Sequence, residues 1–172
     1  NKLSNTLLRN SQHFISFQID NLIFKDSFGF LASSIDKLSE SLTDDDFTLT
    51  KTVFKSEEQF KIMRTKGVYP YEYMNNFDKF NCKKLPSIDA FYSKLSGASI
   101  SEEDYEKANK IWNVFNCKTM GNYHDLYLKT DVYLLADIFE NFRTNMIKFH
   151  GLDPVHSYTL PGFSWTALLK NT

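Results

Sequence analysis

The chain has 172 residues, which is long enough for one domain with a hydrophobic core. Hydrophobic residues make up 42% and charged residues 24% of the sequence, a composition that excludes an intrinsically disordered chain. Lys and Arg number 20 against 21 Asp and Glu, for a net charge of −1. This balance excludes a strong basic field over the whole molecule and leaves room for a local basic patch.

Cysteine usage and hydropathy exclude two further classes. Cys82 and Cys117 lie far apart without metal-ligand spacing, which excludes a zinc ribbon or a disulfide scaffold and favours a reducing compartment. No apolar run approaches the roughly 18 residues of a membrane-spanning helix, so we expect no membrane partner. The chain begins at Asn1, with neither an initiator Met nor a signal-peptide pattern, and we expect it to be a piece of a longer protein.

The first fifty residues predict a hairpin followed by a helix. Residues 12–19 and 22–26 alternate as strands do, and Asp20-Asn21 between them suits a two-residue turn. A helix is expected from about Phe28 to Glu40, capped by Asp26 or Ser27. The three aspartates at 44–46 predict a solvated loop rather than a metal site.

The middle of the chain predicts short helices and an irregular segment. Ser56 begins a capping-box sequence, and the helix that it opens is expected to end at Gly67. Residues 66–86 are expected to be irregular, with a local excess of lysine. A short helix over residues 87–95 follows, and Ser101 opens a longer one.

The last helix is expected to begin at Asn122 and to end at Gly151. Asp131 interrupts its apolar stripe four residues after Tyr127, and a carboxylate on a buried face must be hydrogen-bonded, paired or bound to a metal. Two interpretations are open: a structural carboxylate satisfied by a backbone N–H or a lysine, or a metal ligand with a tyrosine hydroxyl one turn away. Asp137 and Glu140 are predicted to be ordinary solvated charges.

Four blocks of sequence, in order along the chain, resemble the protein-primed family B DNA polymerases of Polinton/Maverick elements and related viruses. They are FLASSIDKL at 30–38, KGVYPYEYM at 66–74, GNYHDLYLKTD at 121–131 and YTLPGFSW at 158–165. Within the third block, Tyr127 and Asp131 resemble the third exonuclease motif of that family. The likeness extends over nearly the whole chain.

The resemblance implies an α/β fold class, namely a partial RNase H-like exonuclease domain, helix-rich with an N-terminal β-hairpin. Residues 1–150 would then form the C-terminal portion of a 3′–5′ exonuclease-like domain, and residues 151–172 would lead toward a polymerase domain that this chain lacks. Its parts would be a hairpin and helix over 12–42, an inserted helical and irregular region over 51–100, and motif-bearing helices over 102–149.

The function implied is that of a fragment of a DNA-directed DNA polymerase acting in DNA replication. Asp131 would be a metal ligand, Tyr127 would orient the attacking water, and Lys66 would reach the scissile phosphate or Tyr127. The complete parent would use two Mg²⁺ (or Mn²⁺) ions. This chain has no Asp-x-Glu pair on an opening strand, and Asn75–Asp78 falls in the wrong order for the second motif, so we expect a loop there. One carboxylate cannot hold two hard cations, so we expect the chain alone to be inactive.

The same resemblance implies contacts to DNA. Ser27 and Phe28 resemble a single-strand-binding block in which Phe28 replaces the usual Leu, although a helix cap is an equal alternative for Ser27. Tyr69, Lys83 and Lys84 mix rings and cations as single-strand grooves do, whereas core packing and a solvated surface remain the plain alternatives. The four histidines have no ligand spacing and are given no role.

The partners implied are single-stranded and primer-template DNA, the remainder of the polymerase chain and a terminal priming protein, inside the cell at the nucleus or a viral replication site. The alternative function is a domesticated or truncated non-catalytic module that binds DNA or a protein. A stand-alone nuclease is disfavoured because one carboxylate motif does not make a site.

Overall fold

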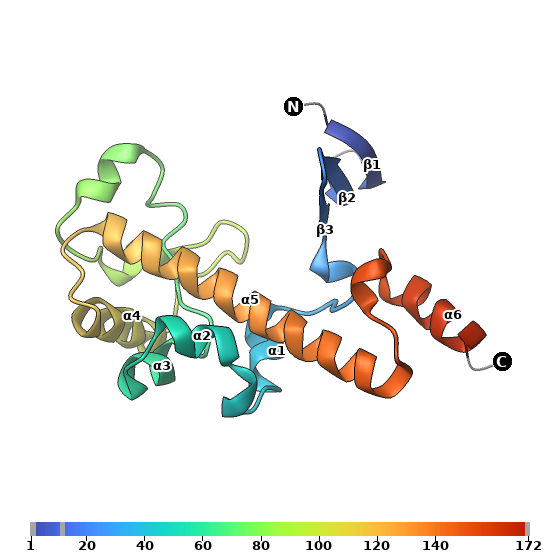
Figure 1. The fold of residues 1–172 in the computed structure, drawn as a ribbon. Coiled ribbons are helices and arrows are strands. Elements are labelled where there is room, and N and C mark those ends of the chain that lie inside the picture. The colour runs from blue at the N-terminus through green and yellow to red at the C-terminus, as the bar shows by residue number, and fades with distance from the viewer. Residues whose placement is uncertain (1–2, 11–12, 171–172) are drawn as a thin grey trace. The chain divides into compact units, whose positions relative to one another are not determined.

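A computed structural model describes residues 3–10 and 13–170 of the chain. The fold is mixed α/β and helix-rich, with a three-stranded antiparallel sheet at the N-terminal side (Figure 1). Its contacts divide it into two compact units. Unit 1 is built from residues before 35 and after 138, and unit 2 from residues 35–138.

The sheet of unit 1 has the order β1 (Leu3–Asn10), β2 (His13–Ile19) and β3 (Leu22–Lys25). Strands β2 and β3 pair antiparallel across the Asp20-Asn21 turn, in which Asp20 has a φ of 51°. The predicted hairpin is therefore confirmed. Strand β1 was not predicted, because its residues do not alternate cleanly and its pairing with β2 has several register shifts.

The helix expected from Phe28 to Glu40 is wrong over its first half. Only a 3₁₀ turn, η1 (Ser27–Gly29), and the later α1 (Ile35–Glu40) are present. Between them the buried Phe30 packs edge-on against Phe139, with 5.8 Å between ring centroids. The chain around Phe30 is therefore non-helical, and the Phe30 side chain is buried between η1 and α1 in the sequence.

The C-terminal segments complete unit 1. After a 3₁₀ turn, η5 (Pro154–His156), the chain forms α6 (Leu160–Lys170). The described part of the expected connection, residues 151–170, is therefore largely helical. Lys25 ties the sheet to this region, since its ammonium donates to two carbonyls of residues 155 and 157 and lies 4.8 Å from the centre of the Tyr158 ring.

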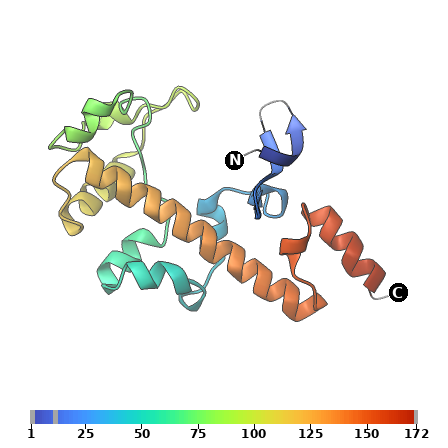
Figure 2. The same cartoon turned by 45° about the horizontal axis from the view of Figure 1, so that its top comes forward.

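Unit 2 contains most of the helices. They are η2 (Asp44–Asp46), α2 (Thr48–Val53), α3 (Glu57–Met63), η3 (Phe77–Asn81), η4 (Ile88–Phe91), α4 (Glu102–Val114) and most of α5 (Met120–His150). Its core is formed by large buried side chains from α3, α4 and α5 and by Phe47, which lies between η2 and α2. The helical members include Phe60, Met63, Ile111, Met120, Tyr123 and Leu134. The segment 77–98 lies beside the N-terminal end of α5 in both ribbon views (Figures 1 and 2), and Met120 N–H donates to the Cys82 carbonyl at 2.8 Å.

The predicted helix starts in unit 2 are mostly confirmed, whereas the predicted ends are too long. Ser101 accepts a hydrogen bond from the Asp104 N–H (3.1 Å) at the start of α4. Ser56 is the N-cap residue of α3 but makes no side-chain capping bond, and this helix ends at Met63 instead of Gly67. The helix expected over 87–95 is only the short turn η4.

Helix α5 begins two residues before the expected cap. The Asn122 side-chain oxygen accepts from the N–H groups of Lys118 and Thr119, at 3.1 and 3.2 Å, so it still satisfies donors at this helix end. Gly151 follows the helix with a φ of 61°, as expected of a helix stop.

The prediction that Asp137 is a solvated charge is wrong. Asp137 is completely buried, and its carboxylate accepts from the backbone N–H groups of Leu49 (2.7 Å) and Thr50 (2.8 Å) at the start of α2. The fully buried line of α5 passes through Leu134 and Asp137, while Asp131 lies half-buried at its margin. Helix α2 was not predicted, and its packing on α5 is what buries Asp137.

Candidate functional site

The site in unit 2 is built from α5 and from the irregular segment that follows α3. Tyr127 and Asp131 lie one turn apart on α5, and Lys66 lies close enough to lower the pKa of Asp131 by its charge. The structure therefore brings together the three residues for which a catalytic role was expected.

Asp131 is the electrostatic centre of this site. Its Oδ1 is buried without a hydrogen-bond partner, and within residues 3–10 and 13–170 only Thr50 Oγ1 shares this state. Burial raises the pKa of Asp131 above its usual range, while the Tyr127 hydroxyl and the Lys66 charge act in the opposite direction. Oδ1 therefore lacks the backbone N–H partner of the structural interpretation, whereas the charge of Lys66 agrees with both interpretations.

Tyr127 is held by two other tyrosines. Its ring stacks on Tyr69, with 4.8 Å between centroids and 29° between planes, and its hydroxyl lies 2.7 Å from the hydroxyl of the exposed Tyr71. The pKa of Tyr127 is raised mainly by burial, and also by the hydrogen bond to Tyr71 and the charge of Asp131. Its hydroxyl therefore stays protonated at neutral pH and can donate a hydrogen bond.

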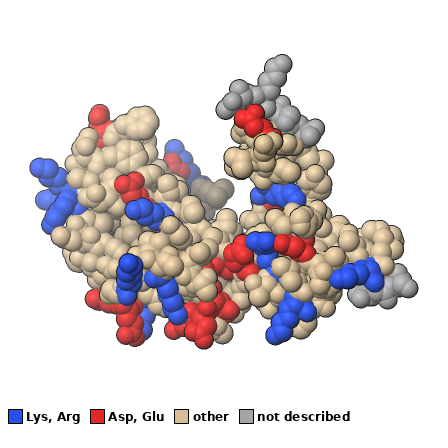
Figure 3. All heavy atoms as spheres, in the orientation of Figure 1, with Lys and Arg blue, Asp and Glu red and all other residues tan. Residues whose placement is uncertain are grey.

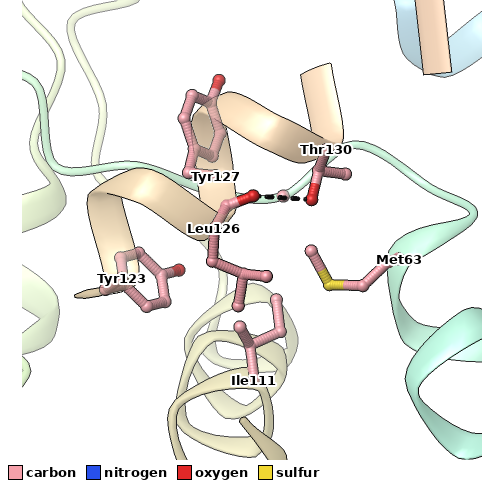
Figure 4. Close-up of a pocket in the computed structure, with 7 residues that line it drawn as sticks. Met63, Ile111, Tyr123, Leu126, Tyr127 and Thr130 are labelled. Carbon is pink, nitrogen blue, oxygen red and sulfur yellow. Dashed lines mark hydrogen bonds between the residues drawn. The ribbon is translucent and has the colours of Figure 1, made fainter. Parts of the chain in front are cut away.

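Beneath this ring lies a small apolar cavity of about 10 Å³, room for about one water molecule. Figure 4 shows its lining and shows the Tyr127 hydroxyl pointing away from it. The residues that line it are Met63, Gly67, Ile111, Tyr123, Leu126, Tyr127 and Thr130. The Thr130 hydroxyl donates to the Leu126 carbonyl at 2.9 Å. This cavity is a feature of core packing, too small for an organic ligand.

His124, which was given no role, contacts the site. Its Nδ1 lies 2.7 Å from the Tyr69 hydroxyl, and its ring packs edge-on against Phe80 at 4.9 Å. His124 precedes Tyr127 by three residues, a spacing that places both side chains on one helix face. This spacing was the signal that could have found it.

The other residues expected to bind DNA are distributed over both units. In unit 1, Phe28 is about half exposed, with the Arg9 guanidinium 5.7 Å from its ring centre. Ser27 is half-buried, and the side chain that caps η1 belongs to Asp26, which accepts from the Phe28 N–H at 3.0 Å. The structure thus gives the capping role expected of Asp26 or Ser27 to Asp26.

In unit 2, Lys83 and Lys84 are exposed just after η3. Nearby, the Lys79 ammonium lies 4.1 Å from the centre of the Tyr73 ring, a cation–π contact. On the face shown in Figure 3, basic side chains are interspersed with acidic ones, in keeping with the net charge of −1. Any DNA contact here would depend on a few lysines rather than on a broad basic surface.

Asp131 is the donor that the resemblance assigns to a metal. Within the part of the chain that the structure describes, no three His, Cys, Asp or Glu side chains are grouped to hold an ion. The unpartnered Oδ1 of Asp131 fits as one oxygen ligand, but one carboxylate does not complete a two-ion site. None of the described helices has the length and apolarity to cross a bilayer.

Comparison of the chain with protein-family models, with curated proteins and with solved structures finds no match.

Proposed function

We propose that the chain is part of a protein-primed, family B DNA-directed DNA polymerase, in which it contributes the third exonuclease motif and single-strand contacts of 3′–5′ proofreading. The observation that supports this most is that Tyr127 and Asp131 lie one turn apart on α5, while the charge of Lys66 acts on Asp131, whose buried Oδ1 has no hydrogen-bond partner. Lys66 precedes Tyr127 by 61 residues in the sequence, so the proximity of its segment to α5 depends on the fold.

In this proposal each residue has a role that matches its surroundings. Asp131 supplies one ligand to a divalent cation, Mg²⁺ or Mn²⁺, which when bound would activate water and stabilise a leaving oxygen. The protonated Tyr127 hydroxyl orients the attacking water. Lys66 neutralises the scissile phosphate. The rest of an RNase H-like exonuclease domain, in the parent protein, supplies the missing carboxylates.

The test of the catalytic part is the Asp131→Ala variant of the complete parent polymerase. We expect 3′–5′ degradation of a labelled strand to fall about a hundredfold, the usual effect of losing a metal ligand, while DNA synthesis continues. The control is Asp125→Ala, because Asp125 is exposed on the same helix. Unchanged degradation in Asp131→Ala would return Asp131 to a structural role.

The test of the DNA contacts uses the present chain. Replacing Lys66, Lys83 and Lys84 together with Gln should lower the steepness of the salt dependence of single-strand binding by up to about two units, at roughly 0.7 per lost phosphate contact. A matched control replaces three lysines elsewhere in unit 2, namely Lys55, Lys110 and Lys118, all exposed. Equal slopes for the site variant and the unmodified chain would remove these lysines from the proposed DNA contact.

A second candidate, a non-catalytic module that binds DNA or a protein, is favoured by one observation. The described residues contain no group of three His, Cys, Asp or Glu side chains placed to hold an ion. The complete reading frame decides between the two candidates: an upstream Asp-x-Glu pair and a downstream polymerase palm support the enzyme, and their absence supports the module.

A further inference from the structure

The segment that carries Lys66 has no secondary structure of its own. Residues 65–70, here called the Lys66 loop, follow the end of α3 and form neither helix nor strand. A loop outside helices and strands depends on other groups if its side chains are to keep a fixed position.

Two side chains from neighbouring helices supply this support. The Lys107 ammonium, from α4, donates to the Lys66 carbonyl (2.8 Å) and to the Thr65 hydroxyl (2.6 Å). The Tyr123 hydroxyl, from α5, donates to the Val68 carbonyl (2.8 Å). The two anchored carbonyls flank Gly67 on either side.

Gly67 is the point at which the Lys66 loop touches the candidate site. A Cβ placed on Gly67 would lie 3.3 Å from Cδ2 of the Tyr127 ring, so the backbone itself packs on that ring. Fixing the carbonyls on both sides of Gly67 therefore fixes the distance between the loop and Tyr127.

Both anchors are directed inward rather than toward solvent. Tyr123 is 2% exposed, and burial raises the pKa of its hydroxyl, which keeps it a donor. Burial lowers the pKa of Lys107, with Asp36 of α1 and Asp104 of α4 acting in the opposite direction. Burying a lysine is costly unless its donors are used, and here they are used on the loop.

We propose that Lys107 and Tyr123 are positioning residues that hold the Lys66 loop against Tyr127 and thereby keep Lys66 beside Asp131. The consequence for DNA contact by Lys66 rests on the proposed function, whereas the positioning of the loop does not. The closing experiment therefore measures the two separately.

The positioning is measured by nuclear magnetic resonance on the whole chain, through the Gly67 Hα resonances. The Tyr127 ring should displace these resonances from their usual positions, and Tyr127→Leu defines the positions without the ring. In Tyr123→Phe and in Lys107→Met we expect the resonances to move most of the way to the Tyr127→Leu positions. Lys110→Met is the matched control, because Lys110 is an exposed lysine on the same helix as Lys107, and it should leave them unchanged.

The consequence for DNA is measured by the salt dependence of single-strand binding. Lys66→Met and Tyr123→Phe should each lower the slope by about 0.7. The double variant should lower it no further than Lys66→Met alone, because both substitutions remove the same phosphate contact, the one made by Lys66. Tyr123→Phe changes no charge, so a loss in this variant cannot be a direct charge effect.

The outcomes separate the two ideas. Unchanged Gly67 resonances in folded Tyr123→Phe would overturn the positioning proposal, and this conservative variant decides the matter even if Lys107→Met does not fold. Displaced resonances with no effect of Lys66→Met on the slope would support positioning and contradict the DNA contact of Lys66.

Discussion

At the scale of single residues, Asp131 combines the position of a proposed metal ligand with a cost to stability. Its Oδ1 is buried without a partner, and an unsatisfied buried acceptor typically costs about 1–3 kcal/mol. The cost is largest when the carboxylate is charged. Burial disfavours the charged form, and this raises the pKa of Asp131. Residues that are strained or unsatisfied in this way are typical of functional sites rather than of cores optimised for stability.

We therefore predict that Asp131→Asn stabilises the chain at neutral pH. Because the pKa of Asp131 is raised in the folded state, the folded state binds the proton more tightly than the unfolded state does, and stability falls as the pH rises from the unfolded pKa of about 4. The neutral amide removes this dependence. Thermal unfolding at pH 7 should shift upward by about 2–4 °C, the effect of roughly 1 kcal/mol in a chain of this size.

Two comparisons check this prediction. The gain should shrink as the pH is lowered through about 4, below which Asp131 is protonated in both states. Asp125→Asn, on the exposed side of the same helix, should change the unfolding temperature little at either pH. A lower unfolding temperature for Asp131→Asn at pH 7 would contradict the assignment of an unsatisfied carboxylate.

Asp137 has the opposite character, since its carboxylate is fully used by α2. We predict that Asp137→Ala destabilises the chain by about 2–4 kcal/mol, because two backbone N–H groups at the start of α2 lose their acceptor inside the core. Urea unfolding of this variant, with Asp125→Ala as the solvated control, measures the loss. A change below about 0.5 kcal/mol, typical of surface positions, would show that α2 is capped in another way.

At the scale of elements, the end of α5 depends on Gly151. Its φ of 61° and its N–H bond to the Ile147 carbonyl (2.8 Å) are typical of a helix stop, and Lys170 donates to the Gly151 carbonyl at 2.9 Å. A Cβ on Gly151 would lie 2.6 Å from the Lys170 ammonium. Both the backbone conformation and the neighbouring side chain therefore favour glycine.

We predict that Gly151→Ala costs about 1–2 kcal/mol of unfolding free energy, the penalty of a left-handed conformation at an alanine. Gly162→Ala is the matched control. Gly162 lies inside α6, and the nearest atom to its Cβ would be at an ordinary 3.7 Å, so alanine should stabilise by up to about 1 kcal/mol through helix propensity. Equal effects of the two substitutions in chemical denaturation would contradict this account of the helix end.

At the scale of the whole molecule, the proposed function makes this site one part of a catalytic centre. The described residues place Asp131 near Tyr127 and Lys66 without a group of three metal-binding side chains, whereas two-metal hydrolysis needs several carboxylates around two ions about 4 Å apart. The rest of the centre would have to come from another part of the parent protein.

We predict that the purified chain alone does not degrade single-stranded DNA, with Mg²⁺ or with Mn²⁺. The assay is degradation of an end-labelled strand over hours, with the complete parent polymerase as the positive control. Degradation that chelators stop and that Asp131→Ala abolishes would show that the chain makes a complete site by itself.

Local signals in the sequence determined the β2–β3 hairpin, the cap at Ser101, the glycine stop at Gly151 and the helical spacing of Tyr127 and Asp131. Each of these depends on a few neighbouring residues: alternation, a turn pair, a capping side chain or a conformation that only glycine adopts easily. Their physical causes are contained in short stretches of chain, so the sequence alone is sufficient to predict them.

Tertiary packing decided the features that local patterns could not carry. The chain leaves the helical conformation after η1 because Phe30 packs on Phe139. Asp137 is buried because the short helix α2 presents two N–H groups to its carboxylate. Lys66 is held near Asp131 because Lys107 and Tyr123 donate hydrogen bonds to its loop. A buried polar group is stable only where distant segments supply its partners, and which segments meet is fixed by the fold as a whole.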